Sequence, residues 1–320
     1  MKVVILDDYQ DAVRTLPCFA LLQGHAVRVF NDSTQDLDVL AARLAGAEAL
    51  VLIRERTPIS AALLDRLPDL RLISQTGRGI AHIDLKACSR RGVAVAVGSG
   101  SPHSTAELTW ALLLAAMRQL PQEVARLKAG QWQGSLGTGL RGRTLGLFGF
   151  GNIGRVVAGY GQAFGMRVLV WGRDSTLARA REQGFETAPS QQALFEQADA
   201  LSLHLRLVEQ TRGIIGAGDL ACMQPGAVLV NTSRAELIEP GALLAALQAG
   251  RPGRAAVDVY EEEPAPDHPL LRLDNVICTP HLGYVEQDSY QLYFTAAFEH
   301  LLAFAAGAPC NLVNPEVLGA

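Results

Sequence analysis

The feature that most constrains this chain is a glycine-rich turn set between an apolar run and a segment of helical length. The run Leu145 to Phe148 has the length and composition of a buried parallel strand. It continues directly into Gly149-x-Gly151-x-x-Gly154. In such a strand–turn–helix unit the first glycine permits a tight turn, the second lets the backbone approach a pyrophosphate, and the third lets the helix pack on the strand.

The start of the following helix adds to this pattern, because a helix N-terminus offers free N–H groups and the positive end of a dipole to phosphates. The spacing of glycines alone is a weak signal in a chain with 31 of them. The strand before the turn and the helix after it make the signal specific. We therefore predict that Gly149, Gly151, Asn152, Ile153 and Gly154 bind a dinucleotide cofactor.

The composition fits a globular protein of two domains, with 320 residues, 49% apolar residues and 19% charged residues. The net charge of −4 gives no electrostatic case for nucleic acid, and no apolar run approaches the ~20 residues of a membrane span. The N-terminal residues 1–6 resemble a strand and lack the cleavage region of a signal peptide, so we expect a cytoplasmic protein. Five scattered cysteines predict reduced, mostly buried thiols.

Apolar strands alternate with helical patterns from the N-terminus, which predicts a parallel sheet with helices on both faces. The predicted strands are Val3–Leu6, Ala26–Phe30, Ala49–Ile53, Leu72–Ser74 and Val93–Val97. The predicted helices lie around Ala12–Leu22, Leu37–Ala45, Ala61–Leu67 and Leu85–Arg91, with Ser60 and Asp84 as N-caps of the last two.

A break at Gly98–Pro102 separates this series from a second one. We expect a long helix over Ser104–Leu127 and a loop over Gly130–Gly142 before the second series starts at Thr144. Its later strands are predicted at Val168–Trp171, Ala200–Leu205, Ala227–Asn231, Ala255–Val259 and Val276–Cys278. A helix over Val285–Ala306 would carry the chain back to the first domain.

Four ordered motifs resemble those of the D-isomer-specific 2-hydroxyacid dehydrogenases, and the resemblance covers nearly the whole chain. After the glycine turn come Val-Asn-Thr-Ser-Arg at 230–234, Val-Asp-Val-Tyr-Glu-Glu-Glu-Pro at 257–264, and Thr-Pro-His at 279–281. The resemblance implies an α/β fold of two doubly wound parallel-sheet domains, with a Rossmann cofactor domain inserted in a flavodoxin-like substrate domain. It implies a substrate domain of 1–99 and 284–320, a dinucleotide-binding domain of 100–283, and a homodimer formed largely through the cofactor domain.

Reduction of a 2-keto acid needs a hydride donor, a proton donor and a cation for the substrate's oxygens. Arg234 follows a buried strand, at the carboxyl end where α/β sheets place ligands, although a surface arginine is the alternative. Imidazole suits proton transfer near neutrality, which fits His281 unless that ring is only structural. The family pattern assigns His281 as acid and base, Glu263 as its partner and Arg234 as the substrate cation. Glu261 and Glu262 are the neighbours that could be confused with Glu263.

The resemblance implies further contacts around this group. Thr105 matches a cofactor contact and Asp258 a contact with the nicotinamide end, although the former fits a helix N-terminal threonine and the latter a loop cap. Arg78 and Gly79 belong to a loop whose N–H groups bind the substrate carboxylate in the family. Arg54 matches a substrate-contacting arginine of phosphoglycerate dehydrogenases, or is a solvated loop charge.

The end of the second strand of the cofactor domain predicts a preference for NADP over NAD. An NAD-specific site places an acid there to bind the ribose 2′-OH. Here Gly172 stands in that place and Arg173 follows, which favours a 2′-phosphate, unless the strand ends later and Asp174 serves as the acid.

The sequence favours the first of three functions and leaves the other two as alternatives. The first is an NAD(P)-dependent reductase of small 2-keto acids, of the glyoxylate or hydroxypyruvate type. The second is a 3-phosphoglycerate dehydrogenase, suggested by Arg54 and Arg56. The third is a non-catalytic NAD(H)-sensing scaffold of the same fold, because such proteins can keep the catalytic residues. The histidines lack the spacing of metal ligands, so we expect no metal site.

Overall fold

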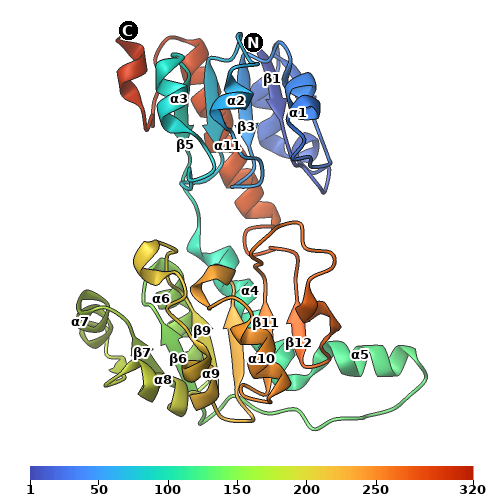
Figure 1. Ribbon diagram of the computed structural model, residues 1–320, viewed down its shortest axis with the longest axis vertical. Coiled ribbons are helices and arrows are strands. Elements are labelled where there is room, and N and C mark those ends of the chain that lie inside the picture. The colour runs from blue at the N-terminus through green and yellow to red at the C-terminus, as the bar shows by residue number, and fades with distance from the viewer. Residues whose placement is uncertain (320) are drawn as a thin grey trace. The chain divides into compact units, whose positions relative to one another are not determined.

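The computed structural model describes residues 1–319 and divides into two compact units (Figure 1). Unit 1 contains Met1–Ser101 and the C-terminal segment from Glu286, and unit 2 is Pro102–Val285. Both boundaries fall two residues later in the chain than the sequence suggested. Within the described residues no helix is long and apolar enough to cross a membrane.

Unit 1 is built on five parallel strands in the order β2-β1-β3-β4-β5. The strands are β1 (Lys2–Ile5), β2 (Ala26–Val29), β3 (Ala49–Leu52), β4 (Leu72–Gln75) and β5 (Ala94–Val97). This order is the flavodoxin-like form of a doubly wound sheet, in which the strand order reverses between β1 and β3. The predicted strands agree with these within one or two residues.

Helices cover both faces of this sheet because alternate strand residues point to opposite sides. On one side α1 (Leu37–Leu44), α2 (Ala61–Leu64) and α3 (Leu85–Arg90) pack on a buried apolar cluster with strand residues such as Leu50 and Ile73. On the other side lies α11 (Gln287–Ala305), which crosses behind β4 in Figure 1. Ser74 of β4 donates its hydroxyl to the Ala297 carbonyl of α11. The predicted N-caps are confirmed, since Ser60 and Asp84 accept N–H groups of α2 and α3.

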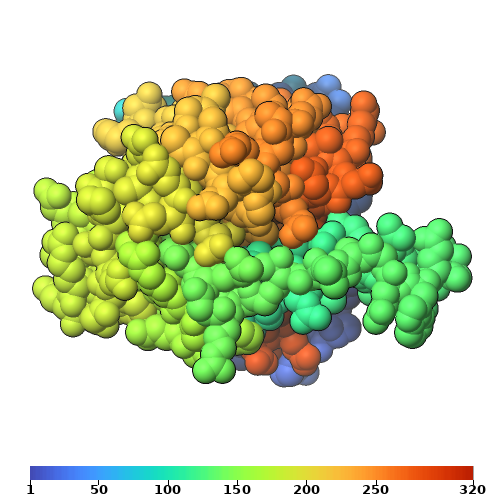
Figure 2. Space-filling view, turned by 90° about the horizontal axis from the view of Figure 1, so that it is seen from below, coloured from blue at the N-terminus to red at the C-terminus, as the bar shows by residue number. Residues whose placement is uncertain are grey.

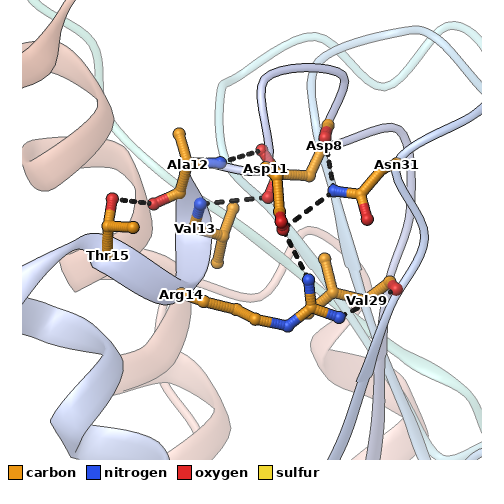
Figure 3. A network of polar contacts seen from close by, with 8 residues as sticks. All are labelled: Asp8, Asp11, Ala12, Val13, Arg14, Thr15, Val29 and Asn31. Carbon is orange, nitrogen blue, oxygen red and sulfur yellow. Dashed lines mark hydrogen bonds and ion pairs between the residues drawn. The ribbon is translucent and has the colours of Figure 1, made fainter.

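The segment 12–22 is not the single α-helix that its composition suggested. It forms two 3₁₀ helices, η1 (Val13–Thr15) and η2 (Pro17–Leu22), separated by the extended residue Leu16. Pro17 has no N–H to continue the first helix. The Asp8 carboxylate fixes the start of η1 by accepting the N–H groups of Ala12 and Val13 at 3.1 and 3.0 Å (Figure 3).

Unit 2 is built on seven parallel strands in the order β12-β11-β10-β9-β6-β7-β8. The strands are β6 (Thr144–Phe148), β7 (Arg167–Trp171), β8 (Glu186–Thr187), β9 (Ala200–Leu203), β10 (Val228–Asn231), β11 (Arg254–Val257) and β12 (Val276–Cys278). The order reverses between β6 and β9, as in a Rossmann fold. The two-residue strand β8 was not predicted, because it is too short to show a periodic pattern.

Two apolar clusters lie on the two faces of this sheet. One contains residues of α8 (Gln191–Gln197), α9 (Ala217–Cys222) and α10 (Ala242–Gln248), and the other contains residues of α4 (Pro102–Arg118), α6 (Asn152–Ala163) and α7 (Asp174–Glu182). Short 3₁₀ turns complete the chain at η3 (Glu209–Thr211), η4 (Ala235–Leu237), η5 (Pro269–Arg272) and η6 (Pro315–Leu318).

The predicted long helix 104–127 is wrong as a single element. It is divided into α4 and α5 (Leu120–Lys128) at Gln119, whose φ of 52° is left-handed. Pro121 lies in the first turn of the second helix, and a proline there has no N–H to donate back into the first helix. Helix α5 and the loop after it project from the rest of unit 2 (Figures 1 and 2).

Candidate active site

The glycine turn of unit 2 has the geometry of a pyrophosphate-binding turn. Gly149 follows β6 with φ of 100°, and a Cβ added there would collide with the carbonyl oxygen of His204. A Cβ added at Gly154 would lie 2.8 Å from the Gly149 carbonyl oxygen, so this glycine allows the first turn of α6 to pack closely. A Cβ added at Gly151 would meet no atom within 4 Å. The turn therefore leaves open space beside Gly151 for a phosphate group.

The N-terminus of α6 is suited to an anion. Its N-cap is Gly151, no side chain caps it, and its first turn carries no acidic residue. The leading N–H groups of a helix have no partner within the helix and attract negative charge. Burial lowers the pKa of the neighbouring His204 to about 4, so its ring is neutral beside this turn. The residues present thus fit the pyrophosphate of a dinucleotide.

The end of β7 carries no acid. The strand ends at Trp171, Gly172 follows, and the exposed Arg173 is the N-cap of α7. Asp174 is already the first residue of that helix, so the strand does not end later, as the NAD-specific alternative would need. A Cβ added at Gly172 would lie 2.9 Å from Cγ2 of Thr176, so an acid at this position requires Thr176 to move.

The structure brings His281 and Glu263 together. Nδ1 of His281 lies 2.6 Å from Oε2 of Glu263, whose other oxygen accepts the backbone N–H of Tyr260 at 3.0 Å. The neighbouring Glu261 instead pairs with His268 at 3.1 Å, so this acid has a different partner from Glu263. Because Nδ1 is engaged by the carboxylate, Nε2 is the ring nitrogen left to exchange a proton with a substrate.

The electrostatics of the pair keep Glu263 ionised. Burial by itself raises the pKa of Glu263, but the hydrogen bond and charge of His281, the Tyr260 N–H and the charge of Arg234 together lower it. Arg234 follows β10, and Asn231 at the end of that strand donates its amide to the Arg234 carbonyl at 2.9 Å. The three predicted catalytic residues therefore belong to one unit and act on one another.

The loop that carries His281 is held from two sides. The buried Asp258, just after β11, accepts the Thr279 hydroxyl at 2.6 Å and the N–H groups of Leu282 and Gly283 at 2.7 and 2.8 Å. Thr105 donates to the Gly283 carbonyl at 2.8 Å. These bonds hold His281 at a left-handed φ of 54°. The geometry thus shows Asp258 and Thr105 as supports of the loop, while their contacts with the cofactor stay predictions.

Ser104 is a further residue of this support, and it donates to the same Gly283 carbonyl as Thr105, at 3.0 Å. Its position directly before Thr105 is the only sequence signal for it. Thr279, which belongs to the Thr-Pro-His motif but was assigned no role from the sequence, bonds Asp258. Tyr284 is 4% exposed and packs edge-on against the His281 ring, with 5.7 Å between the ring centres.

The predicted substrate-binding residues lie together in unit 1, at the carboxyl ends of adjacent strands. Arg54 follows β3, and Arg78 and Gly79 follow β4. The Arg54 guanidinium lies 5.8 Å from the centre of the Tyr293 ring. Arg56, the second cation suggested for phosphate recognition, donates to the Asp7 carbonyl at 2.5 Å and lies 4.3 Å over the Tyr9 ring. Its guanidinium therefore takes part in the internal packing of unit 1.

Exchange of Glu263 for glutamine tests the pairing with His281. The lowered pKa of Glu263 keeps a negative charge beside the imidazole, and that charge favours the protonated ring. Keto-acid reduction needs the protonated ring, so its rate falls as pH rises and the ring loses its proton. We expect Glu263→Gln to move this falling limb of the pH–rate profile to lower pH. Glu262→Gln is the matched control and should leave the profile unchanged; an unchanged profile for Glu263→Gln contradicts the pairing.

Comparison with known proteins shows the family to which this chain is related. The family model for the D-isomer specific 2-hydroxyacid dehydrogenase NAD binding domain matches residues 110–283. A glyoxylate reductase of Aeropyrum pernix is 38% identical over 88% of this chain and 87% of its own length. A D-3-phosphoglycerate dehydrogenase of Methanocaldococcus jannaschii is 35% identical over 98% of this chain but only 59% of its own. The crystal structure of a phosphoglycerate oxidoreductase of Vibrio cholerae is 55% identical, covers 96% of this chain and 100% of that one, and superposes with a TM-score of 0.93.

The chain therefore belongs to the D-isomer-specific 2-hydroxyacid dehydrogenases. It is an oxidoreductase that transfers a hydride between a nicotinamide cofactor and a 2-hydroxy acid. The resemblance inferred from four short motifs is confirmed, as is the expectation of two parallel-sheet α/β domains.

Proposed function

We propose that this enzyme reduces small 2-keto acids of the glyoxylate or hydroxypyruvate type, with NADPH as its preferred cofactor. The observation that carries the proposal is the 2.6 Å contact between His281 and Glu263, with Arg234 acting on the same carboxylate. The glycine turn before α6 would hold the dinucleotide, whose nicotinamide would supply the hydride for the keto carbon. Nε2 of His281 gives a proton to the carbonyl oxygen, Glu263 balances the imidazolium charge, and Arg234 binds the substrate's oxygens.

The alternative, oxidation of 3-phosphoglycerate, has support in the names of several relatives. It needs cations for a phosphate beyond those for the carboxylate. Arg56 is engaged with the Asp7 carbonyl and the Tyr9 ring inside unit 1, which argues against Arg56 as a phosphate ligand. This engagement of Arg56 favours the smaller, unphosphorylated substrates. The third possibility, a sensing scaffold, predicts cofactor binding without turnover.

A single set of rate measurements separates the three possibilities. NADPH and NADH oxidation is followed with glyoxylate and with hydroxypyruvate, and NADP⁺ and NAD⁺ reduction is followed with 3-phosphoglycerate. We expect keto-acid reduction with NADPH to have the largest kcat/KM. Faster turnover of 3-phosphoglycerate would establish the alternative, and cofactor binding with no turnover of any substrate would establish the scaffold.

A cytoplasmic location stays a prediction from the N-terminal sequence.

We also propose that the enzyme is a homodimer and that α5 with the loop after it forms the contact. Leu120, Val124 and Leu127 are exposed on one face of α5, at the spacing of a helical stripe. In the loop that follows, Trp132 is 76% exposed and Leu136 is 94% exposed. A row of large apolar side chains on a projecting element marks a protein contact. We call α5 and the loop after it the arm. A second copy of this chain is the partner that fits best, because the arm of each copy can pack on the other copy.

The double variant Leu127→Lys with Trp132→Lys is expected to make the enzyme monomeric at micromolar concentration, because it places charges where the partner would exclude water. Sedimentation velocity measures the change. The matched control is Val208→Lys, which alters an exposed apolar residue of unit 2 away from the arm and should leave the dimer intact. A dimer that persists in the double variant contradicts the assignment of the arm.

A further inference from the structure

The buried side chain of Gln75 connects two loops of unit 1 that are far apart in the sequence. Gln75 ends β4 and is 0% exposed. Its Nε2 donates to the carbonyl of Arg54 at 2.8 Å and to the carbonyl of Gly79 at 2.9 Å. An amide nitrogen has two hydrogens, so both are used. One side chain thus fixes the loop after β3 to the loop after β4.

The bond to Arg54 acts on an uncommon backbone conformation. Arg54 has a φ of 58°, in the left-handed region that non-glycine residues rarely adopt. Its N–H donates to Oγ1 of Thr76 at 3.2 Å, and that hydroxyl in turn donates to the Leu52 carbonyl at 2.9 Å. Both polar groups of the Arg54 backbone are therefore held by side chains of two consecutive residues at the end of β4. Such strain persists only where the surroundings enforce it, and it is frequent at functional sites.

This backbone conformation determines where the Arg54 guanidinium lies. A Cβ added at Gly77 would be 2.7 Å from Nη1 of Arg54, so the guanidinium rests directly on the glycine-rich loop. The other side of the guanidinium faces the Tyr293 ring at 5.8 Å. Release of the Arg54 carbonyl would free the backbone to leave the left-handed region and would move the charge away from this loop.

The free-energy penalty of burying the Gln75 side chain indicates that its role is not only to stabilise the sheet. Among residues 1–319 its Oε1 atom has no hydrogen-bond partner although it is buried. A buried oxygen without a partner destabilises a fold, and an apolar side chain of similar length would avoid this penalty. The opposite amide orientation would point the oxygen at two carbonyl oxygens, so the two donated bonds fix the orientation.

We infer that Gln75 is a positioning residue for substrate recognition, holding Arg54 and the Arg78–Gly79 loop in the arrangement that binds the keto acid. The inference rests on the proposed function for the identity of the substrate. It assigns Gln75 no contact with the reacting atoms. The positions of the two loops, and with them the Michaelis constant for the keto acid, depend on the two hydrogen bonds of its amide.

The main test is Gln75→Met, which keeps the length of the side chain and removes both hydrogen bonds. We expect the KM for glyoxylate and hydroxypyruvate to rise about tenfold, which equals ~1.4 kcal/mol, and kcat to change less than about threefold. The Kd for NADPH should not change. Gln75→Glu is a second variant of nearly the same shape, and it should raise KM as well because its oxygens face two carbonyls.

The matched control is Asn314→Leu. Asn314 is another buried amide that connects two segments of unit 1, accepting the Val95 N–H at 2.8 Å and donating to the Val93 carbonyl at 2.9 Å. Its loss should lower the melting temperature and leave KM unchanged. An equal rise of KM in both variants, or in neither, overturns the inference.

Hydrogen–deuterium exchange separates a failure of this inference from a failure of the proposed function. Without any substrate, Gln75→Met should speed the exchange of amides in residues 53–57 and 76–80, and Asn314→Leu should not. If the wild-type enzyme reduces no keto acid, the proposed function fails while the exchange still reports on the two loops. If the wild type is active and neither KM nor loop exchange responds to Gln75→Met, the positioning role is wrong.

Discussion

His281→Asn is expected to lower kcat for keto-acid reduction by ~10²–10⁴-fold, the usual contribution of a general acid. The imidazole is the group that gives its proton to the carbonyl oxygen, and Glu263 at 2.6 Å orients it. Asparagine is the informative replacement because His281 has a φ of 54°, and asparagine is among the residues that tolerate this region. The loop should therefore keep its conformation. Steady-state rates at saturating NADPH measure the loss, and fluorescence titration with NADPH should give a Kd within about twofold of the wild type.

The matched control for this change is His268→Asn. His268 lies in the same unit and pairs with Glu261 instead of Glu263. Its replacement should alter kcat by no more than about threefold, as expected for a change that touches no reacting atom. If His281→Asn retains more than a tenth of the wild-type kcat, the proton donor is another residue.

Arg173→Ala is expected to weaken NADPH by roughly ten- to a hundredfold and to affect NADH much less. Arg173 is exposed at the N-cap of α7, directly after the glycine that takes the place of the acid. A charge-assisted hydrogen bond to the 2′-phosphate contributes ~1.5–3 kcal/mol, and ~1.4 kcal/mol corresponds to a factor of ten. Dissociation constants of both cofactors, measured by calorimetry on the wild type and the variant, check the expectation.

The reverse change places an acid at the end of β7. Gly172→Asp alone would press on Thr176, so we combine it with Thr176→Ser, which removes the Cγ2 atom that lies 2.9 Å from the new Cβ. The combined variant should prefer NADH, because a carboxylate binds the ribose hydroxyls and repels the 2′-phosphate. Thr176→Ser alone is the control and should keep the wild-type preference. A wild-type enzyme that prefers NADH would refute the assignment of Gly172 and Arg173.

Much of the fold could be predicted because its signals are local. Each buried parallel strand is a short apolar run, and Ser60 and Asp84 are caps whose bonds reach only three residues ahead. The errors fell where backbone chemistry overrides composition. Pro17 and Pro121 stand inside apolar stretches that look helical, and each proline lies in the first turn of a new helix just after the preceding helix has ended.

The candidate site likewise has features that the sequence predicts and features that only the structure shows. The motifs predicted Arg234, Glu263 and His281 and favoured Glu263 over its two acidic neighbours, and the structure adds the 2.6 Å contact between Glu263 and His281. Thr105 and Asp258 matched cofactor contacts by position, whereas the structure shows what they hold, which is the loop of His281. The role of Gln75 is invisible in the sequence because its partners, Arg54 and Gly79, meet only when β3 and β4 pair.

The sequence by itself determined the alternation of strands and helices, the dinucleotide turn and the candidate catalytic residues, because each of these depends on residues within one short segment. Only the tertiary structure decided the strand orders of the two sheets, the projection of α5, and the hydrogen bonds that hold Arg54 and His281 in left-handed conformations. The physical reason is that strand pairing brings together groups that are far apart in the sequence. A buried donor or acceptor forms its hydrogen bond with a group that the folded sheet places next to it. No local sequence pattern specifies which group that is.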